Sequence, residues 1–205
     1  MAKNTSPDCK QCRREGCKLF LKGERCLTKC SFDKRPVVPG QHGTAKKKIS
    51  EYGLQLREKQ KVRRAYCMLE KQFRNTYEKA AKSKEVTGFA FLKMLELRLD
   101  NVVYRMGLGV SRMEARQVVN HGHITVNGKK VNIPSYQVKV GDVIAVKESK
   151  QSLEKFASLK GVKVNTPKWL EFNTESLTGK VLALPEREDI DPSIKEHLIV
   201  EFYSR

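Results

Sequence analysis

The 205-residue chain carries 41 Lys and Arg against 23 Asp and Glu, a formal net charge of +18 at pH 7. Its 13 Gly and 7 Pro are too few for a collagen-like or mucin-like chain, and its periodic apolar blocks argue against full disorder. No run approaches the ~20 apolar residues of a membrane span, and the first residues hold no apolar signal segment. The length suggests one or two domains of a basic, unexported protein without a membrane partner.

The positive charge is uneven along the chain. Residues 1–50, 51–100, 101–150 and 151–205 carry net charges of +9, +5, +5 and −1. Clustered Lys and Arg gain affinity by displacing counterions from phosphates, so the first three quarters predict a polyanionic partner, whereas a merely solvated basic surface is the plainer alternative. With only 7% aromatic residues and no typical recognition helix, the pattern favours a large structured RNA over a single strand or DNA.

The first half of the chain reads as helical after a Cys-rich start. Residues 1–48 end in a Gly-rich loop that contains His42. Ser50 can cap a helix, a second helix is predicted over about 69–82, and a third is predicted to run unbroken from Thr87 towards Gly107. We interpret the apolar stripes of these helices as core.

The second half changes character. Ser111 begins a capping box for a short helix that reaches about Asn120, and the Asn-Gly pair at 127–128 predicts a hairpin, followed by a strand over 141–146. Beyond it we expect a helix near 152–160 and strands over 169–172, 181–184 and 197–203.

The predicted fold class is α+β. Its parts are a Cys-rich zinc-binding N-terminal region (1–48), the helical part of a first domain (49–98), a module of two helices packed on a short antiparallel sheet (99–165), and C-terminal strands that pack back on the chain (166–205).

Five of the six cysteines lie in the first 30 residues. The pairs Cys9/Cys12 and Cys26/Cys30 have the knuckle spacing with which four thiolates hold one structural zinc ion. Reduced structural thiols and an iron–sulfur cluster are alternatives, and disulfides fit an unexported chain poorly. Cys17 is a fifth candidate ligand that we interpret as a packed or surface thiol.

No motif of an enzyme is present. The sequence contains no nucleophile elbow, phosphate loop or dinucleotide fingerprint. We interpret His121 and His123 as hydrogen-bonding to phosphate or backbone, and the acidic residues 186–191 as a solvated turn. We therefore expect no catalysis.

The short helix predicts a basic face. Arg112, Arg116 and Asn120 are spaced four apart, so they project from one side of it. Guanidinium groups bind phosphate in two-pronged fashion, whereas Asn and His reach base edges and ribose hydroxyls. Ion pairing is the alternative for these arginines, but Glu114 is the only acid between residues 101 and 141.

Several segments of the sequence resemble those of a known family. The segment LELRLDNVVYRMGLGVSRMEARQVVNHGHITVNGKKV resembles the S4 RNA-binding domain. CKQCRREGCKLFLKGERC, RPVVPGQHG, LREKQKVRRAYCMLEKQFRN and LIVEFYSR resemble the bacterial small-subunit ribosomal protein S4 family (universal family uS4), of the zinc-binding type. The likeness covers nearly the whole chain.

This resemblance implies a cytoplasmic constituent of the small ribosomal subunit. It implies binding to the 5′ domain of small-subunit ribosomal RNA, a role in nucleating assembly, and contact with neighbouring ribosomal proteins that affects translational accuracy. It also implies a place near the messenger RNA entrance and no small-molecule substrate. Cys9, Cys12, Cys26 and Cys30 match the zinc ligands, although three residues separate the last pair where four are expected in many relatives.

The candidate RNA-binding residues are polar and basic side chains of the first three quarters. They are Arg13, Arg14, Lys22, Arg35, His42, Lys46, Lys47, Lys48, Arg57, Lys59, Lys61, Arg63, Arg64, Arg74, Arg105, Arg112, Arg116, Asn120, His121, His123, Lys129 and Lys130.

Two other functions use the same module. An RNA-modifying enzyme, such as a pseudouridine synthase, would need a large catalytic domain, and the 57 residues after position 148 are too few. A factor that rescues stalled ribosomal subunits would not need the Cys-rich region.

Overall fold

The computed structural model describes residues 4–45, 48–162 and 164–205, and the chain divides into two compact units. Unit 1 comprises Met1–Leu92 and Pro192–Arg205, and unit 2 comprises Lys93–Asp191. Unit 2 is therefore an insertion between two segments that fold together.

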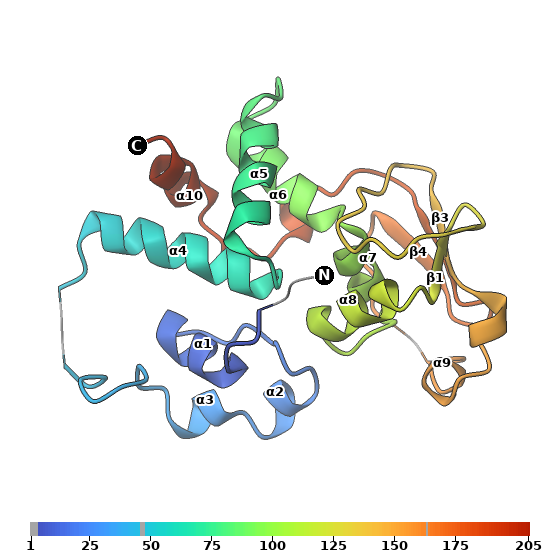
Figure 1. The fold of residues 1–205 in the computed structure, drawn as a ribbon, viewed down its shortest axis with the longest axis horizontal. Coiled ribbons are helices and arrows are strands. Elements are labelled where there is room, and N and C mark those ends of the chain that lie inside the picture. Colours follow the sequence, from blue (N-terminus) through green and yellow to red (C-terminus); the bar gives the residue numbers. More distant parts are fainter. Residues whose placement is uncertain (1–3, 46–47, 163) are drawn as a thin grey trace. The chain divides into compact units, whose positions relative to one another are not determined.

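Unit 1 is built from helices (Figure 1). They are α1 (Asp8–Glu15), α2 (Arg25–Thr28), α3 (Ser31–Lys34), α4 (Glu51–Ala65), α5 (Glu70–Ala81), most of α6 (Thr87–Glu96) and α10 (Glu196–Tyr203). The Ser50 hydroxyl accepts a hydrogen bond from the Gly53 amide (3.2 Å), which confirms the predicted cap of α4. The apolar stripe of α5 meets α6, where the Phe73 and Phe91 rings lie edge to face at 4.9 Å.

The prediction of a strand over 197–203 is wrong, because these residues form α10. Ile199 is buried, and Phe202 and Tyr203 follow it at helical spacing, i+3 and i+4. Tyr203 stacks on Tyr77 of α5 at 4.6 Å. A short apolar run is ambiguous between strand and helix, and here packing against other helices of unit 1 decides it.

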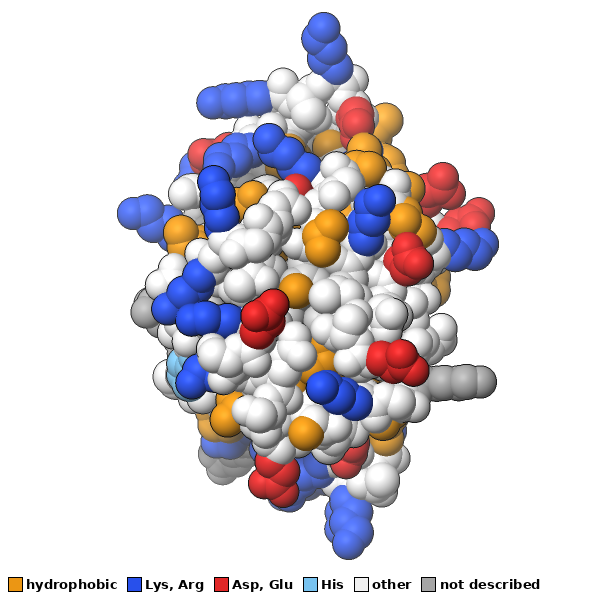
Figure 2. Space-filling model, turned by 90° about the vertical axis from the view of Figure 1, so that its right-hand side faces the viewer, with side chains coloured by type: hydrophobic (Ala, Val, Ile, Leu, Met, Phe, Trp, Pro, Cys, Tyr) orange, Lys and Arg blue, Asp and Glu red, His pale blue; other side chains and the backbone are white. Residues whose placement is uncertain are grey.

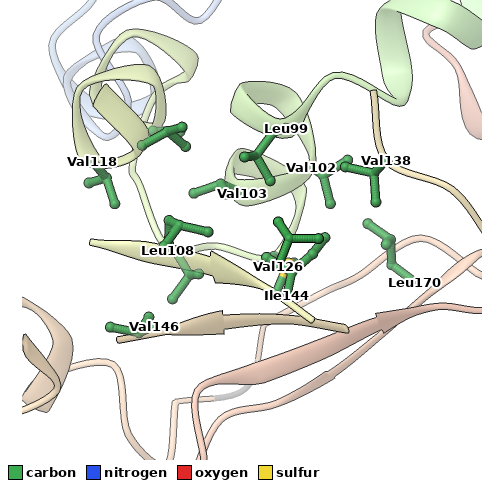
Figure 3. Close-up of a cluster of buried hydrophobic side chains, with 14 of the residues drawn as sticks. Leu99, Val102, Val103, Leu108, Val118, Val126, Val138, Ile144, Val146 and Leu170 are labelled. Carbon is green, nitrogen blue, oxygen red and sulfur yellow. The ribbon is translucent and has the colours of Figure 1, made fainter. Parts of the chain in front are cut away.

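Unit 2 packs helices on an antiparallel sheet. Its elements are α7 (Leu99–Arg105), α8 (Arg112–Asn120), β1 (Ile124–Val126), β2 (Lys129–Lys130), β3 (Val143–Val146), the 3-10 helices η1 (Glu148–Lys150) and η2 (Arg187–Asp189), α9 (Glu154–Ala157), β4 (Leu170–Asn173) and β5 (Thr178–Val181). The sheet order is β2-β1-β3-β5-β4. Figure 3 shows apolar side chains of α7 and α8 meeting those of β1 and β3 in one core.

Two local predictions in unit 2 are confirmed. The Ser111 hydroxyl accepts from the Glu114 amide (3.3 Å) and caps α8. Asn127 and Gly128 both have positive φ (50° and 77°), as the tight turn between β1 and β2 requires.

The third predicted helix does not run unbroken from Thr87, because it divides into α6 and α7 at Leu97 and Arg98. The backbone there bonds to a distant segment: the Leu97 carbonyl accepts from the Val138 amide (2.9 Å), and the Leu99 amide donates to the Tyr136 carbonyl (2.9 Å). These partners replace the helical hydrogen bonds, which the local sequence could not indicate.

Two predictions after residue 148 differ from the structure. The helix expected near 152–160 is one short turn, α9. The strand expected over 181–184 is misplaced, because β5 covers Thr178–Val181 and shares only Val181 with it. The strand expected over 169–172 corresponds to β4.

Candidate nucleic-acid interface

A buried ion-pair network joins the start of α7 to the middle of α8 in unit 2. Asp100 accepts from Arg98 through both carboxylate oxygens (3.1 and 2.8 Å) and from Arg116 Nη1 (2.8 Å). The Asn101 amide adds a further hydrogen bond to Asp100 at 3.0 Å. Arg98, Asp100 and Arg116 are all buried, so these charges are satisfied internally.

A second network holds two more candidate arginines. Arg105 forms a two-pronged bond with buried Glu96 (3.1 and 2.9 Å), and the Asn101 side-chain amide donates to the same carboxylate (2.7 Å). Arg112 donates to Asn101 Oδ1 (2.8 Å) and lies over the Tyr104 ring at 4.6 Å.

The expectation that acids are too scarce to pair with these arginines is wrong. Glu96 and Asp100 lie just before residues 101–141 in the sequence, and in the fold they pair with Arg105 and Arg116. Arg116 is only 6% exposed and does not project from the helix face as predicted, because its guanidinium turns to Asp100.

The solvated basic corner of unit 2 lies at the end of α8 and in the β1–β2 hairpin. Asn120, His121, Lys129 and Lys130 are exposed. The Lys130 side chain packs over Gly122, where a Cβ would collide with its Cε, so a residue with a side chain would displace this lysine. The corner thus presents three cationic or titratable side chains and one amide to a ligand.

His123 completes this corner from a half-buried position. Its ring meets those of His121 and Phe156 edge to face, at 5.8 and 6.0 Å. Burial lowers the pKa of His123, and the charges of His121, Lys150, Lys155 and Lys130 lower it further. This lowered pKa favours the neutral imidazole of His123 at neutral pH.

Lys150 and Lys155 are functional candidates that the sequence did not single out. Both act electrostatically on His123, and Lys155 also pairs with Glu114 (2.7 Å). They lie far from the hairpin in sequence, and no motif marks them.

Several candidates in unit 1 are solvated. Arg14, Lys22, Arg35, His42, Lys48 and Arg74 are exposed. Lys46 and Lys47 lie outside the described residues. Arg13 is half-buried and donates to the Val37 carbonyl at 2.7 Å.

The candidate cations of α4 are held by acids of unit 1. Glu15 of α1 pairs with Arg57 (3.2 Å) and Arg64, Glu70 of α5 pairs with Lys59 (2.7 Å) and Arg63 (3.5 Å), and Glu58 pairs with Lys61 (3.1 Å). These pairs fix α1 and α5 on α4. The contribution of the α4 cations to RNA binding remains a prediction.

Replacing Glu15 with Ala should lower the free energy of unfolding by about 2–3 kcal/mol, because it leaves Arg57 and Arg64 without their carboxylate. The Glu15 side chain is 1% exposed, whereas the two arginines keep part of their hydration, so the loss stays below that of a fully buried pair. Denaturant unfolding monitored by circular dichroism measures it.

The neutral variant Glu15→Gln is the matched control and should cost less than half as much, because its side-chain oxygen can still accept from Arg57 and Arg64, which both bond to the same oxygen of Glu15. Burial raises the pKa of Glu15 above its ordinary value of 4.5, against the charges of Arg57, Arg64 and Arg14. The stability linked to this raised pKa is present at low pH and is lost as pH rises through the pKa that Glu15 has in the folded protein. The free energy of unfolding of wild type should therefore rise relative to that of Glu15→Gln as pH falls from 7 towards 4.5. A fall of the wild-type value relative to Glu15→Gln on acidification would contradict a raised pKa for Glu15.

Three of the predicted zinc ligands act electrostatically on the fourth, Cys12. Burial raises the pKa of Cys12, the Leu19 amide opposes this, and the charges of Cys26, Cys30 and Cys9 raise it further. The Lys22 amide donates to the Cys26 sulfur (3.3 Å). Among the described residues, however, no group of three or more His, Cys, Asp or Glu is arranged so that it could hold a metal ion. The donor chemistry fits zinc, but the closed four-thiolate arrangement is not formed in this structure.

Figure 2 shows one face of the molecule on which Lys and Arg side chains are spread over much of the view, with Asp and Glu side chains among them. Within the described ranges, no helix has both the length and the apolar character needed to cross a bilayer.

A helical cationic unit and a helix-and-sheet module with a solvated basic corner define a nucleic-acid-binding protein.

Comparisons with known proteins identify the family. Residues 3–96 match the model of the ribosomal protein S4/S9 N-terminal domain, and residues 97–144 match the S4 domain. The chain is 62% identical over full length to the small ribosomal subunit protein uS4 of Ruminiclostridium cellulolyticum and to that of Acetivibrio thermocellus, and 61% identical over full length to that of Clostridioides difficile. The chain belongs to the uS4 family of ribosomal proteins, which is not a family of enzymes.

Proposed function

We propose that this protein is a cytoplasmic constituent of the small ribosomal subunit that binds ribosomal RNA directly. Full-length similarity to uS4 proteins, together with the exposed basic corner of unit 2, carries the proposal. The corner is formed by Asn120, His121, Lys129 and Lys130 at the end of α8 and in the β1–β2 hairpin, where their exposed side chains can contact a folded RNA.

The finer proposal concerns the RNA target and the neighbours. We propose that the protein binds the 5′ domain of small-subunit ribosomal RNA, nucleates assembly there, and contacts neighbouring ribosomal proteins in a way that affects translational accuracy. The basic residues 46–48 are proposed to lie near the messenger RNA entrance. Family membership supports these proposals.

The mechanism is phosphate neutralisation combined with recognition of RNA shape. Lys129 and Lys130 neutralise phosphates, and His121, His123 and Asn120 donate to phosphate or ribose oxygens. Half-buried Arg105 of α7 and buried Arg116 of α8 position this corner, since their charges are matched by Glu96 and Asp100.

Binding of the full chain to a transcript of the 5′ domain tests the function. We expect tight binding at about 0.15 M salt, and a logarithmic salt slope that falls by about 0.7–0.9 for each phosphate contact removed by Lys129→Gln or Lys130→Gln. Lys180→Gln, an exposed lysine of β5, is the control and should leave the slope unchanged. A wild-type chain that does not bind the transcript at this salt contradicts the proposed function.

We further propose that Cys9, Cys12, Cys26 and Cys30 hold one structural zinc ion. Their two-pair spacing, the electrostatic effect of the other three on Cys12, and the hydrogen bond from the Lys22 amide to the Cys26 sulfur support it. When bound, zinc would neutralise thiolates that burial otherwise disfavours and would fix the short helices of residues 8–34. Metal analysis of the purified protein should find about one zinc per chain, and its absence from protein prepared without chelator contradicts the proposal.

A further inference from the structure

A pocket of about 570 Å³ opens in unit 1 between α4, the start of α5 and the end of α10. Its volume lies in the ~300–1,000 Å³ range of ligand sites. The charged side chains that line it are Lys59, Arg63, Arg74 and Arg205 against the single acid Glu70. The pocket therefore attracts an anion.

The one acid is already matched by its neighbours. Glu70 accepts from Lys59 (2.7 Å) and from the Tyr203 hydroxyl (2.9 Å), and Arg63 lies 3.5 Å from its other oxygen. Burial alone would raise the pKa of Glu70, but these hydrogen bonds and the nearby cations lower it, so the carboxylate stays ionised at neutral pH. One carboxylate shared by Lys59 and Arg63 does not balance the four cations of the lining, so the pocket keeps a net positive charge.

These arginines can reach an incoming group. Arg74 bonds Glu78 through Nε (3.0 Å), and its side chain is 68% exposed. Arg205 is exposed at the pocket rim. Arg63 Nε donates a hydrogen bond to Gln60 Oε1 (2.8 Å), which orients its guanidinium within the pocket lining. Planar, oriented guanidinium groups favour phosphate over a simple halide ion.

An aromatic surface accompanies the cations. Phe202 is half-buried in the pocket lining, and Lys59 Nζ lies 4.7 Å from its ring centroid. Tyr203 packs edge to face against it at 5.3 Å and fixes its orientation. A phosphate-binding arginine cluster beside a fixed aromatic ring is the combination with which proteins bind unpaired nucleotides.

We propose that this pocket binds one unpaired nucleotide of the ribosomal RNA, with its base against Phe202 and its phosphate among Arg63, Arg74 and Arg205. The inference rests on the proposed function, because it names a nucleotide of the same RNA. An acidic peptide would use the cations but would gain little from the ring, so the ring favours RNA.

The test compares full-length variants for binding to the 5′-domain transcript. Arg74→Gln removes an exposed cation without disturbing the core, and Phe202→Leu removes the ring but keeps apolar contact. Each should weaken binding by about 5- to 100-fold, as expected for a lost phosphate contact or stacked base. Lys79→Gln, an exposed cation of α5 outside the pocket lining, is the matched control and should change affinity less than threefold.

Ultraviolet cross-linking supplies a readout that does not depend on affinity. Irradiation of the wild-type complex should join one nucleotide to the peptide that contains Phe202 and Tyr203, and this adduct should disappear in Phe202→Leu. Base-specific chemical modification should show the same nucleotide protected in the wild-type complex and reactive in Phe202→Leu.

The outcomes separate the two proposals. If wild type binds the transcript but both pocket variants match Lys79→Gln and no adduct forms at this peptide, the pocket assignment is overturned while RNA binding stands. If the variants bind RNA normally but lose affinity for another ribosomal protein, the occupant is an acidic peptide and the assignment is again overturned. If wild type does not bind the transcript at all, the proposed function itself fails.

Discussion

Replacing Asp100 with Ala is expected to lower the free energy of unfolding by about 3–5 kcal/mol. Asp100 accepts four hydrogen bonds, including those from Arg98 and Arg116, and all three side chains are buried. Without the carboxylate, the charges of two guanidinium groups remain in a poorly hydrated interior. Urea unfolding of the full chain, followed by circular dichroism, measures the loss.

Two further variants give this prediction its controls. Asp100→Asn keeps the shape but removes the charge, and it should lose nearly as much stability as Asp100→Ala. Glu171→Ala removes an exposed carboxylate of β4 and should change stability by less than about 0.5 kcal/mol. An Asp100→Ala protein as stable as Glu171→Ala would show that the network contributes little.

The same network separates positioning from RNA contact. Arg116→Met should lower stability yet leave the salt slope of RNA binding unchanged at temperatures where the variant is folded, because the charge of Arg116 is matched by Asp100. Lys130→Gln should leave stability nearly unchanged but reduce the salt slope, since Lys130 is exposed. A reduced salt slope of RNA binding for Arg116→Met would show that Arg116 contacts the RNA directly.

Elements whose signals are local could be predicted from the sequence. Ser50 and Ser111 each accept from the amide three residues later, and the Asn127–Gly128 turn needs only two positive φ angles. The division between α6 and α7 could not be predicted, because it depends on hydrogen bonds from Leu97 and Leu99 to residues about 40 positions away.

The candidate site shows the same limit. The sequence identified a basic hairpin and helix end, and the exposed Lys129 and Lys130 lie there. It did not indicate that Arg116 is buried against Asp100, because charge counting along the chain ignores acids brought back by folding. Nor did it indicate that Lys150 acts on His123, or that Arg205 joins Arg63 and Arg74 in one pocket.

Removing the proposed zinc ion from the N-terminal region should unfold residues 8–34 and leave unit 2 folded. The helices there are short, of 8, 4 and 4 residues, and short helices are marginal without tertiary support. Few of their side chains are buried, Cys12 and Cys26 among them. A structural zinc ion supplies on the order of 10–16 kcal/mol to such a region, more than its apolar contacts can.

Hydrogen exchange before and after chelation measures this effect. Amides of residues 8–34 should lose protection when a chelator removes the metal, whereas those of α7 and α8 should keep it. Cys26→Ser should mimic chelation, and Cys17→Ser is the control, since Cys17 lies in the same segment outside the two pairs. If Cys17→Ser loses zinc and protection as fully as Cys26→Ser, then Cys17 is a ligand. If chelation leaves protection unchanged, the region is held by Glu15, Arg57 and Arg64 rather than by metal.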